Sequence, residues 1–164
     1  YTRLGRPDIG LLGCTLLNED GTPQQNFRQF PSPAFLLARG LGADRWPWRP
    51  AWYGRRMMDE ARREDPFPVD WVFGAFLLMR RADFTRVGGM DAGYRLYYED
   101  VDLAWRLRRA GLATWMFPAL RFVHAHQRAS AKRPFSKAWR WHLRSALRYF
   151  TRTAGQALPA RPDH

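Results

Sequence analysis

The chain has 164 residues, a length that suits one domain, and its 46% of hydrophobic residues can build a core. Its formal net charge of +12 comes almost entirely from arginine and favours anionic partners: nucleic acid, anionic lipid or phosphorylated small molecules. The single cysteine, Cys14, excludes an intrachain disulfide, and no apolar run reaches the length of a membrane span.

The first half of the chain predicts two buried strands separated by shorter elements. Apolar runs at 9–17 and 69–79 predict the strands, and Gly74 within the second indicates a bulge or a close backbone approach. The intervening segments predict a turn at 18–23, a short return strand at 24–30, a short helix at 35–41, an extended surface loop at 45–56 and one or two helical turns within 57–63.

The second half predicts three helices and one strand. The helix over 100–110 is the clearest, because acids open it, arginines crowd its end and Gly111 suits a left-handed cap. The other elements are a short helix at 80–87, turns at 88–89 and 91–93, a strand at 114–123 broken by Pro118, a long helix at 136–153 and a disordered tail at 159–164.

The long helix carries a basic row beside apolar residues. Arginines recur every four residues, and one side of the helix is predicted to carry Trp139, Leu143, Ala146, Leu147 and Phe150. The basic row suits a solvated face, a nucleic-acid face or a face on anionic lipid, while the apolar side suits packing on the rest of the domain. No nucleic-acid recognition motif is present, so nucleic acid is not expected as a partner.

Glu99, Asp100 and Asp102 open the helix over 100–110, directly after Tyr97 and Tyr98. Acids at a helix start are favoured for capping and dipole reasons alone. A carboxylate beside aromatic rings also suits a sugar ring and a base for its hydroxyl group. The segment by itself leaves both interpretations open.

A second group of polar residues follows the strand at 114–123. His124 and His126 alternate onto one side and can bind a divalent metal or face solvent. Arg128 and Ser130 follow, and they can hold a diphosphate or form a solvated basic loop.

Short motifs stand in a fixed order along nearly the whole chain. They read Ile9-Gly10-Leu11-Leu12-Gly13, Leu17-Asn18-Glu19-Asp20-Gly21-Thr22, Arg28, Phe30-Pro31, Val69-Asp70-Trp71-Val72-Phe73-Gly74-Ala75, Arg80-Arg81, Gly88-Gly89-Met90-Asp91, Tyr98-Glu99-Asp100-Val101-Asp102-Leu103, Arg106, Gly111, Pro118, His124 and Ser130. This ordered set resembles the family 2 glycosyltransferases of GT-A type, and among them the bacterial rhamnosyltransferase-like enzymes that build surface polysaccharides. Galactosyltransferases with a glycine-rich turn and an acidic helix start are a weaker resemblance.

The resemblance implies roles for individual residues. Asp100 matches the general base of an inverting displacement with a nucleoside diphosphate leaving group. His124, and less directly His126, matches a ligand of a divalent metal (Mg or Mn) that is held mostly by an N-terminal half. Substrate-binding positions are implied at Trp71, Gly74, Tyr98, Glu99, Asp102, Arg106, Arg128 and Ser130.

The resemblance also implies an organisation. Residues 1–158 match the C-terminal part of an α/β GT-A fold, a mixed sheet flanked by helices, without the N-terminal nucleotide-binding half and its Asp-x-Asp motif. Such a fragment is expected to be inactive alone. The complete enzyme would move a hexose, such as rhamnose, from a nucleotide sugar to a lipid-linked or polysaccharide acceptor, in the cytoplasm or on the inner face of the cytoplasmic membrane. The alternative is a non-enzymatic basic module that binds anionic membrane or nucleic acid.

Overall fold

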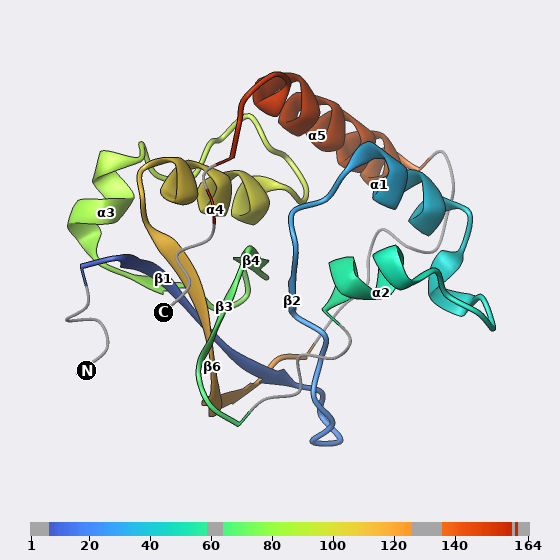
Figure 1. Cartoon of the computed structure of the whole chain (residues 1–164), viewed down its shortest axis with the longest axis horizontal. Coiled ribbons are helices and arrows are strands. Elements are labelled where there is room, and N and C mark those ends of the chain that lie inside the picture. The colour runs from blue at the N-terminus through green and yellow to red at the C-terminus, as the bar shows by residue number, and fades with distance from the viewer. Residues whose placement is uncertain (1–6, 59–63, 126–135, 159, 161–164) are drawn as a thin grey trace.

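The computed structural model describes residues 7–58, 64–125, 136–158 and 160 of the chain. A mixed four-stranded sheet lies at its centre, with the strand order β3–β6–β1–β5, and helices flank it (Figure 1). The four strands are β1 (Ile9–Leu17), β3 (Phe67–Val69), β5 (Leu78–Met79) and β6 (Ala113–Val123). The mixed α/β architecture expected from the sequence is therefore confirmed.

The pair of β1 and β6 forms the centre of this sheet. The two strands run parallel, and nearly all of β1 is buried, as expected for a strand covered on both faces. Pro118 does not break β6, contrary to the prediction. The strand continues past it through a shift in register opposite Cys14 and Thr15, and the Thr15 hydroxyl donates to the Pro118 carbonyl at 3.1 Å.

The prediction of one strand over 69–79 is wrong. The segment divides between β3 and β5 of the central sheet and β4 (Trp71–Val72), which pairs with β2 (Phe27–Arg28) in a separate two-stranded sheet. Val72 packs so closely over β1 that a Cβ on Gly13 would lie 2.6 Å from its side chain. The chain turns again at Gly74, and the return strand predicted at 24–30 shortens to β2.

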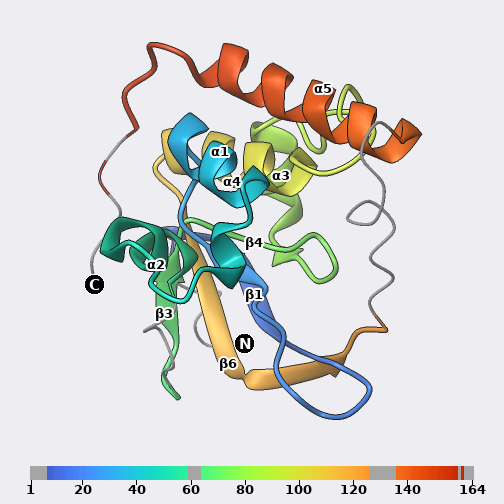
Figure 2. The ribbon, with the colours of Figure 1, turned by 90° about the vertical axis from the view of Figure 1, so that its right-hand side faces the viewer.

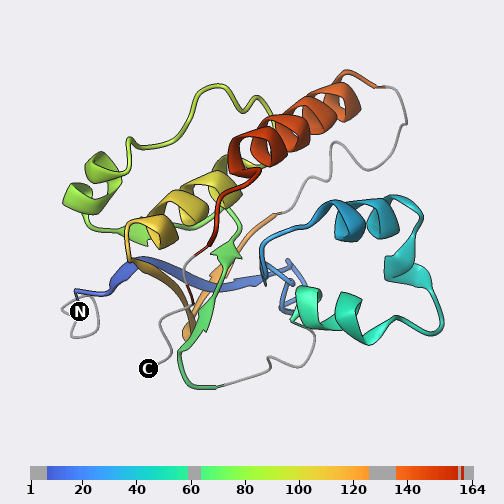
Figure 3. The same cartoon turned by 45° about the horizontal axis from the view of Figure 1, so that its top comes forward.

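Two helices stand together at one end of the molecule (Figure 3). Helix α1 (Pro33–Gly40) confirms the short helix, and Ser32 caps it by accepting from the Phe35 N–H. The surface loop predicted at 45–56 is wrong from residue 51 onward, where α2 (Ala51–Met57) begins, and a 3-10 helix (Ala43–Arg45) ends where the predicted loop starts. Tyr53 explains the error: its ring is fully buried and stacks on Phe35 at 4.9 Å. Of the helical turns predicted at 57–63, residues 59–63 lie outside the described part.

Helix α4 (Glu99–Arg109) confirms the clearest prediction and lies between the sheet and α5 (Figures 1 and 2). Leu103 and Leu107 are fully buried in a cluster with β1, β3 and β6 residues. Val101, Ala104 and Trp105 pack on the other side, in a cluster that includes residues of α5. The helix ends before Gly111, which has a positive φ of 79°. The short helix α3 (Arg81–Arg86) also agrees with its prediction.

Helix α5 (Lys137–Thr153) confirms the long helix, but its buried face differs from the prediction. Ser145, Ala146 and Tyr149 are buried, whereas Trp139, Leu143 and Leu147 are exposed. The buried face follows the spacing of 142, 145, 146 and 149, so the exposed apolar row lies beside it. In the described part of the chain, no helix combines the length and apolar character needed to span a membrane. The tail predicted at 159–164 lies outside the described residues except for residue 160.

Candidate active site

The candidate site is centred on the first turn of α4. Tyr97 and Tyr98 precede the helix with φ values of 60° and 71°, both in the left-handed region. Residues other than glycine rarely adopt this backbone conformation, and each one that does destabilises the fold by about 1–3 kcal/mol. Two consecutive tyrosines held in this conformation therefore single out the junction as a place of functional interest.

Asp100 is the buried carboxylate of this junction. One of its oxygens accepts the Gly74 N–H at 2.9 Å, and the other accepts the Val101 N–H at 2.8 Å. Burial, followed by the neighbouring charge of Glu99, raises the pKa of Asp100 to about 7. The two backbone donors favour the ionised form and oppose this rise. A carboxylate with a pKa near neutrality, held rigidly by backbone donors, is well suited to accept a proton.

Glu99 stands next to Asp100 at the helix start. Its side chain is half-buried, and its Oε2 atom is buried without a hydrogen-bond partner among the described residues. An oxygen in this condition is available to a hydroxyl group of a ligand. The resemblance implied that Glu99 shapes the site or contacts the acceptor, and this role stays a prediction.

Aromatic residues occur in both of the segments that the Gly74–Asp100 hydrogen bond joins. Trp71 and Phe73, just before Gly74 in the chain, stack at 5.5 Å. At the start of α4, Tyr97 lies edge-on to His142 of α5 at 5.1 Å, and Tyr98 lies 5.9 Å from the same imidazole. The ring faces of such residues are common binding surfaces for the apolar faces of sugars and other small molecules.

Sequence reasoning had assigned no role to three residues that the fold brings to this region. Arg28 of β2 lies over the Phe73 ring at 5.0 Å. Burial, and after it the charge of Arg39 of α1, lowers the pKa of Arg28 and that of His142. His142 belongs to the buried face of α5, so its helical spacing from Ser145 and Ala146 was the available clue. The chain carries no periodic pattern that marks Arg28 or Arg39.

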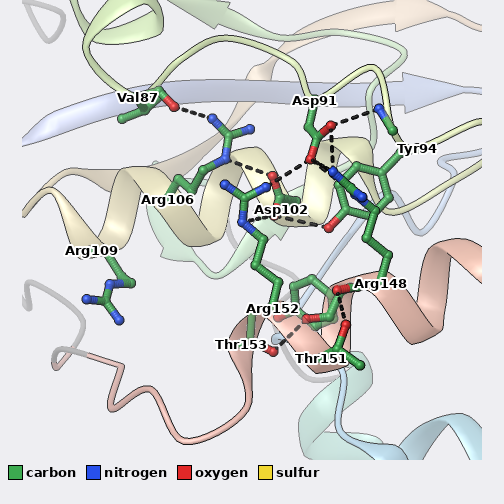
Figure 4. A network of polar contacts seen from close by, with 12 residues as sticks. Val87, Asp91, Tyr94, Asp102, Arg106, Arg109, Arg148, Thr151, Arg152 and Thr153 are labelled. Atoms are coloured by element: carbon green, nitrogen blue, oxygen red, sulfur yellow. Dashed lines mark hydrogen bonds and ion pairs between the residues drawn. The ribbon is translucent and has the colours of Figure 1, made fainter.

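Asp102 and Arg106 form a bridge within α4 (Figure 4). Asp102 is fully buried, and its carboxylate accepts from Arg106 at 2.7 Å and from the Tyr94 hydroxyl at 3.1 Å. Arg106 also donates to the Val87 carbonyl. These contacts fasten the loop before α4 to the helix. Substrate binding by Asp102 and Arg106 stays a prediction beside this structural role.

The same network fastens α5 to the loop (Figure 4). Asp91 pairs with Arg148 at 2.8 Å and with Arg152 at 2.9 Å. Arg152 also lies 3.5 Å from Asp102. Half of the predicted basic row is thus engaged with carboxylates of the domain, and Arg140 and Arg144 remain on the exposed side.

His124 lies just beyond the end of β6 and is held by Gln24. The Gln24 amide donates to the His124 carbonyl at 2.8 Å, and its oxygen lies 3.2 Å from His124 Nδ1. If that oxygen accepts a hydrogen from Nδ1, Nε2 is the nitrogen suited to a metal. The described residues contain no group of three potential metal ligands. His126, Arg128 and Ser130 lie outside the described part.

Comparison with known proteins supports the family resemblance. A family model for the N-terminal domain of galactosyltransferase matches residues 56–128, which include Gly74, Asp100 and His124. Rhamnosyltransferase WbbL of Escherichia coli is 48% identical over 85 residues, which are 51% of this chain and 31% of that protein. N-acetylglucosaminyl-diphospho-decaprenol L-rhamnosyltransferase of Mycobacterium tuberculosis is 35% identical over 136 residues, 79% of this chain and 42% of that protein.

A more distant relative is O-antigen biosynthesis protein RfbC of Myxococcus xanthus, 28% identical over 77% of this chain and 9% of that protein. The chain thus spans well under half the length of these curated relatives. Nothing in the comparisons favours the non-enzymatic module. The chain is therefore homologous to part of the rhamnosyltransferase-like glycosyltransferases of family 2.

Proposed function

We propose that this chain carries the catalytic base and the acceptor side of an inverting hexosyltransferase. The complete enzyme would transfer a sugar, with rhamnose the first candidate, from a nucleotide sugar to a lipid-linked or polysaccharide acceptor. The observation that carries the proposal is the geometry of Asp100, a buried carboxylate with a pKa of about 7 between two backbone donors. The names of the relatives support the transferred sugar and the type of acceptor.

In the proposed reaction, Asp100 removes the proton from the acceptor hydroxyl as its oxygen attacks the anomeric carbon. The bond from that carbon to the nucleoside diphosphate breaks as the new glycosidic bond forms. Attack from the face opposite the leaving group inverts the anomeric centre, and the proton ends on Asp100. The stacked Trp71 and Phe73 rings and the half-buried Glu99 would orient the sugars beside this carboxylate.

A divalent metal, Mg or Mn, belongs to the proposal. His124 fits it as a ligand, because Gln24 holds the imidazole with Nδ1 toward an amide oxygen. A bound metal neutralises charge on a leaving diphosphate. The described residues contain no group of three potential ligands around His124, so most ligands would come from elsewhere in the complete enzyme.

The remaining part of the proposal concerns the rest of the enzyme. Because the chain covers 31% and 42% of two relatives, the nucleotide-binding half of a GT-A fold would lie in sequence outside these 164 residues. The chain alone would then lack most of the donor site and be inactive.

The exposed surface of α5 supports the proposal that the enzyme acts at the inner face of the cytoplasmic membrane. Trp139, Leu143 and Leu147 form an exposed apolar row beside Arg140 and Arg144. Apolar side chains next to arginines suit the boundary of an anionic bilayer, where a lipid-linked acceptor resides.

The decisive experiment is Asp100→Asn in the complete enzyme. We expect sugar transfer to fall by about 10²–10⁴-fold, the range typical of a lost general base. Binding of nucleoside diphosphate, measured by calorimetry, should change little. Asp20→Asn, at an exposed turn carboxylate, is the matched control and should retain activity. Undiminished transfer by the Asp100 variant would remove that residue from the base role.

A further inference from the structure

Arg28 is a buried arginine that forms no ion pair with a carboxylate in the described part of the chain. Only 9% of the residue is exposed, and its guanidinium lies 5.0 Å from the centre of the Phe73 ring and 6.0 Å from that of Trp71. Its Nε is buried without a hydrogen-bond partner, and no ion pair within the described residues involves it. The contacts that hold Arg28 are therefore aromatic faces, which leave its N–H donors unused.

Arg108 is a buried arginine with a structural role, and it serves as a comparison for Arg28. It is 6% exposed, and it donates to the Asp70 carboxylate at 2.7 Å while lying over the Phe30 ring at 5.2 Å. Both arginines thus stack on aromatic rings, but of the two only Arg108 forms an ion pair with a carboxylate of the described residues. Burying an unpaired charge is costly, so Arg28 is a position that structure alone does not explain.

Charged groups of both signs lie near Arg28, and they include the candidate base. Burial, and after it the charge of Arg39, lowers the pKa of Arg28 to about 10, so it remains a cation at neutral pH. The nearby carboxylate of Asp44 is shared with Arg39, at 3.6 Å, and with the Tyr53 hydroxyl, at 2.5 Å. Asp100 also lies close enough to favour the charged form of Arg28.

Chain connectivity places Arg28 beside the site of reaction. The ring under its guanidinium is Phe73, and the next residue, Gly74, donates its N–H to Asp100. An anion bound by Arg28 would therefore lie next to the carboxylate that receives the proton.

We propose that Arg28, assisted by Arg39, binds a diphosphate group of a substrate of this enzyme. The planar guanidinium suits two phosphoryl oxygens at once, and its stacking on Phe73 and Trp71 holds the fork in one orientation. The inference deepens the proposed transfer and rests on it. A diphosphate can reach this place from either substrate, as the leaving group of the nucleotide sugar or as the linkage of a lipid-bound acceptor.

The test is equilibrium binding to the complete enzyme by calorimetry, which needs no turnover. UDP, GDP and dTDP, each titrated separately, represent the donor, and geranyl diphosphate represents the lipid acceptor. Arg28→Met removes the charge and keeps a side chain that can cover the rings. Arg55→Met is the matched control, because it removes an exposed arginine of α2.

We expect Arg28→Met to weaken one of the two kinds of ligand by about 10–100-fold, the effect of losing a charged hydrogen bond. Loss of nucleoside diphosphate binding assigns Arg28 to the donor, and loss of geranyl diphosphate binding assigns it to the acceptor. Arg55→Met should change either affinity by less than about 2-fold, as expected for an exposed charge.

The stability of the variant separates ligand binding from a structural role. Removing an unpaired buried charge should leave the melting temperature of Arg28→Met unchanged or higher. Unchanged affinity for both kinds of ligand, or a protein that unfolds without Arg28, would overturn the inference. If Asp100 is not the base, Asp100→Asn will transfer sugar at an undiminished rate. The binding measurements on Arg28→Met need no turnover, so they would still test diphosphate binding by Arg28.

Discussion

The backbone N–H of Gly74 donates a 2.9 Å hydrogen bond to the carboxylate of Asp100, 26 residues further along the chain. The bond joins the turn after β4 to the start of α4 and sets the direction of the buried carboxylate. A Cβ on residue 74 would stand 3.6 Å from the same oxygen, so glycine leaves the approach to the carboxylate open. The segment that failed to form a single strand is thus the one that orients the candidate base.

The rate of transfer should depend on the ionisation of Asp100. Since its pKa is raised to about 7 in the unliganded protein, we expect kcat/KM of the complete enzyme to rise about 10-fold per pH unit below that value and to level off above it. Glu99 contributes to the raised pKa, so Glu99→Gln should move this limb to lower pH. The measurement is a pH–rate profile for both proteins. A limb that stays in place in Glu99→Gln would argue against electrostatic coupling of the two acids.

The free energy of unfolding should also depend on the ionisation of Asp100. A carboxyl group whose pKa is higher in the folded state contributes stability that is fully present below the unfolded pKa, and this contribution is lost as pH rises toward 7. Between about pH 4 and 7, the free energy of unfolding should therefore fall by a few kcal/mol on this account. Urea unfolding across that range should show a smaller fall for Asp100→Asn. Parallel curves for the two proteins would contradict the raised pKa.

The buried pair of Asp70 and Arg108 should matter to stability far more than the neighbouring exposed arginine. Asp70 also accepts the Phe30 N–H at 2.8 Å, so Arg108→Met leaves a buried carboxylate without its main counter-charge. We expect a loss of about 3–5 kcal/mol in the free energy of unfolding. Arg109→Met, on the same helix and exposed, should cost less than about 1 kcal/mol. Equal losses in chemical denaturation would show that the ion pair is not the cause.

The exposed apolar row of α5 should govern binding to anionic vesicles. Leu143 is 52% exposed, so Leu143→Glu should leave the fold intact while it removes an apolar contact and adds a repelled charge. We expect about 10-fold weaker co-sedimentation with vesicles that contain phosphatidylglycerol. Thr151→Glu adds the same charge on the same helix without removing an apolar side chain, and it should bind more tightly than Leu143→Glu. Equal binding of the two variants would exclude the row as a membrane contact.

The sequence by itself determined the elements whose pattern is local. The buried strand at 9–17, the helices that became α1, α3, α4 and α5, and the cap at Gly111 all follow from periodicity, caps and turn residues. The ordered motifs also identified the family resemblance. The local pattern marked three acids at a helix start, and the resemblance singled out Asp100 among them as the candidate base.

Only the tertiary structure decided features that depend on distant partners. Tyr53 forms a helix where composition indicated a loop, because its ring finds Phe35 across the fold. The run at 69–79 does not form one strand, because its residues make three separate tertiary contacts. Asp70 forms an ion pair with Arg108, Val72 packs on Gly13, and the Gly74 N–H donates to Asp100. Among the described residues, Arg28 and Arg108 are both buried, and Arg28 differs in having no ion pair. Burial and pairing both depend on which residues surround a side chain in the folded protein.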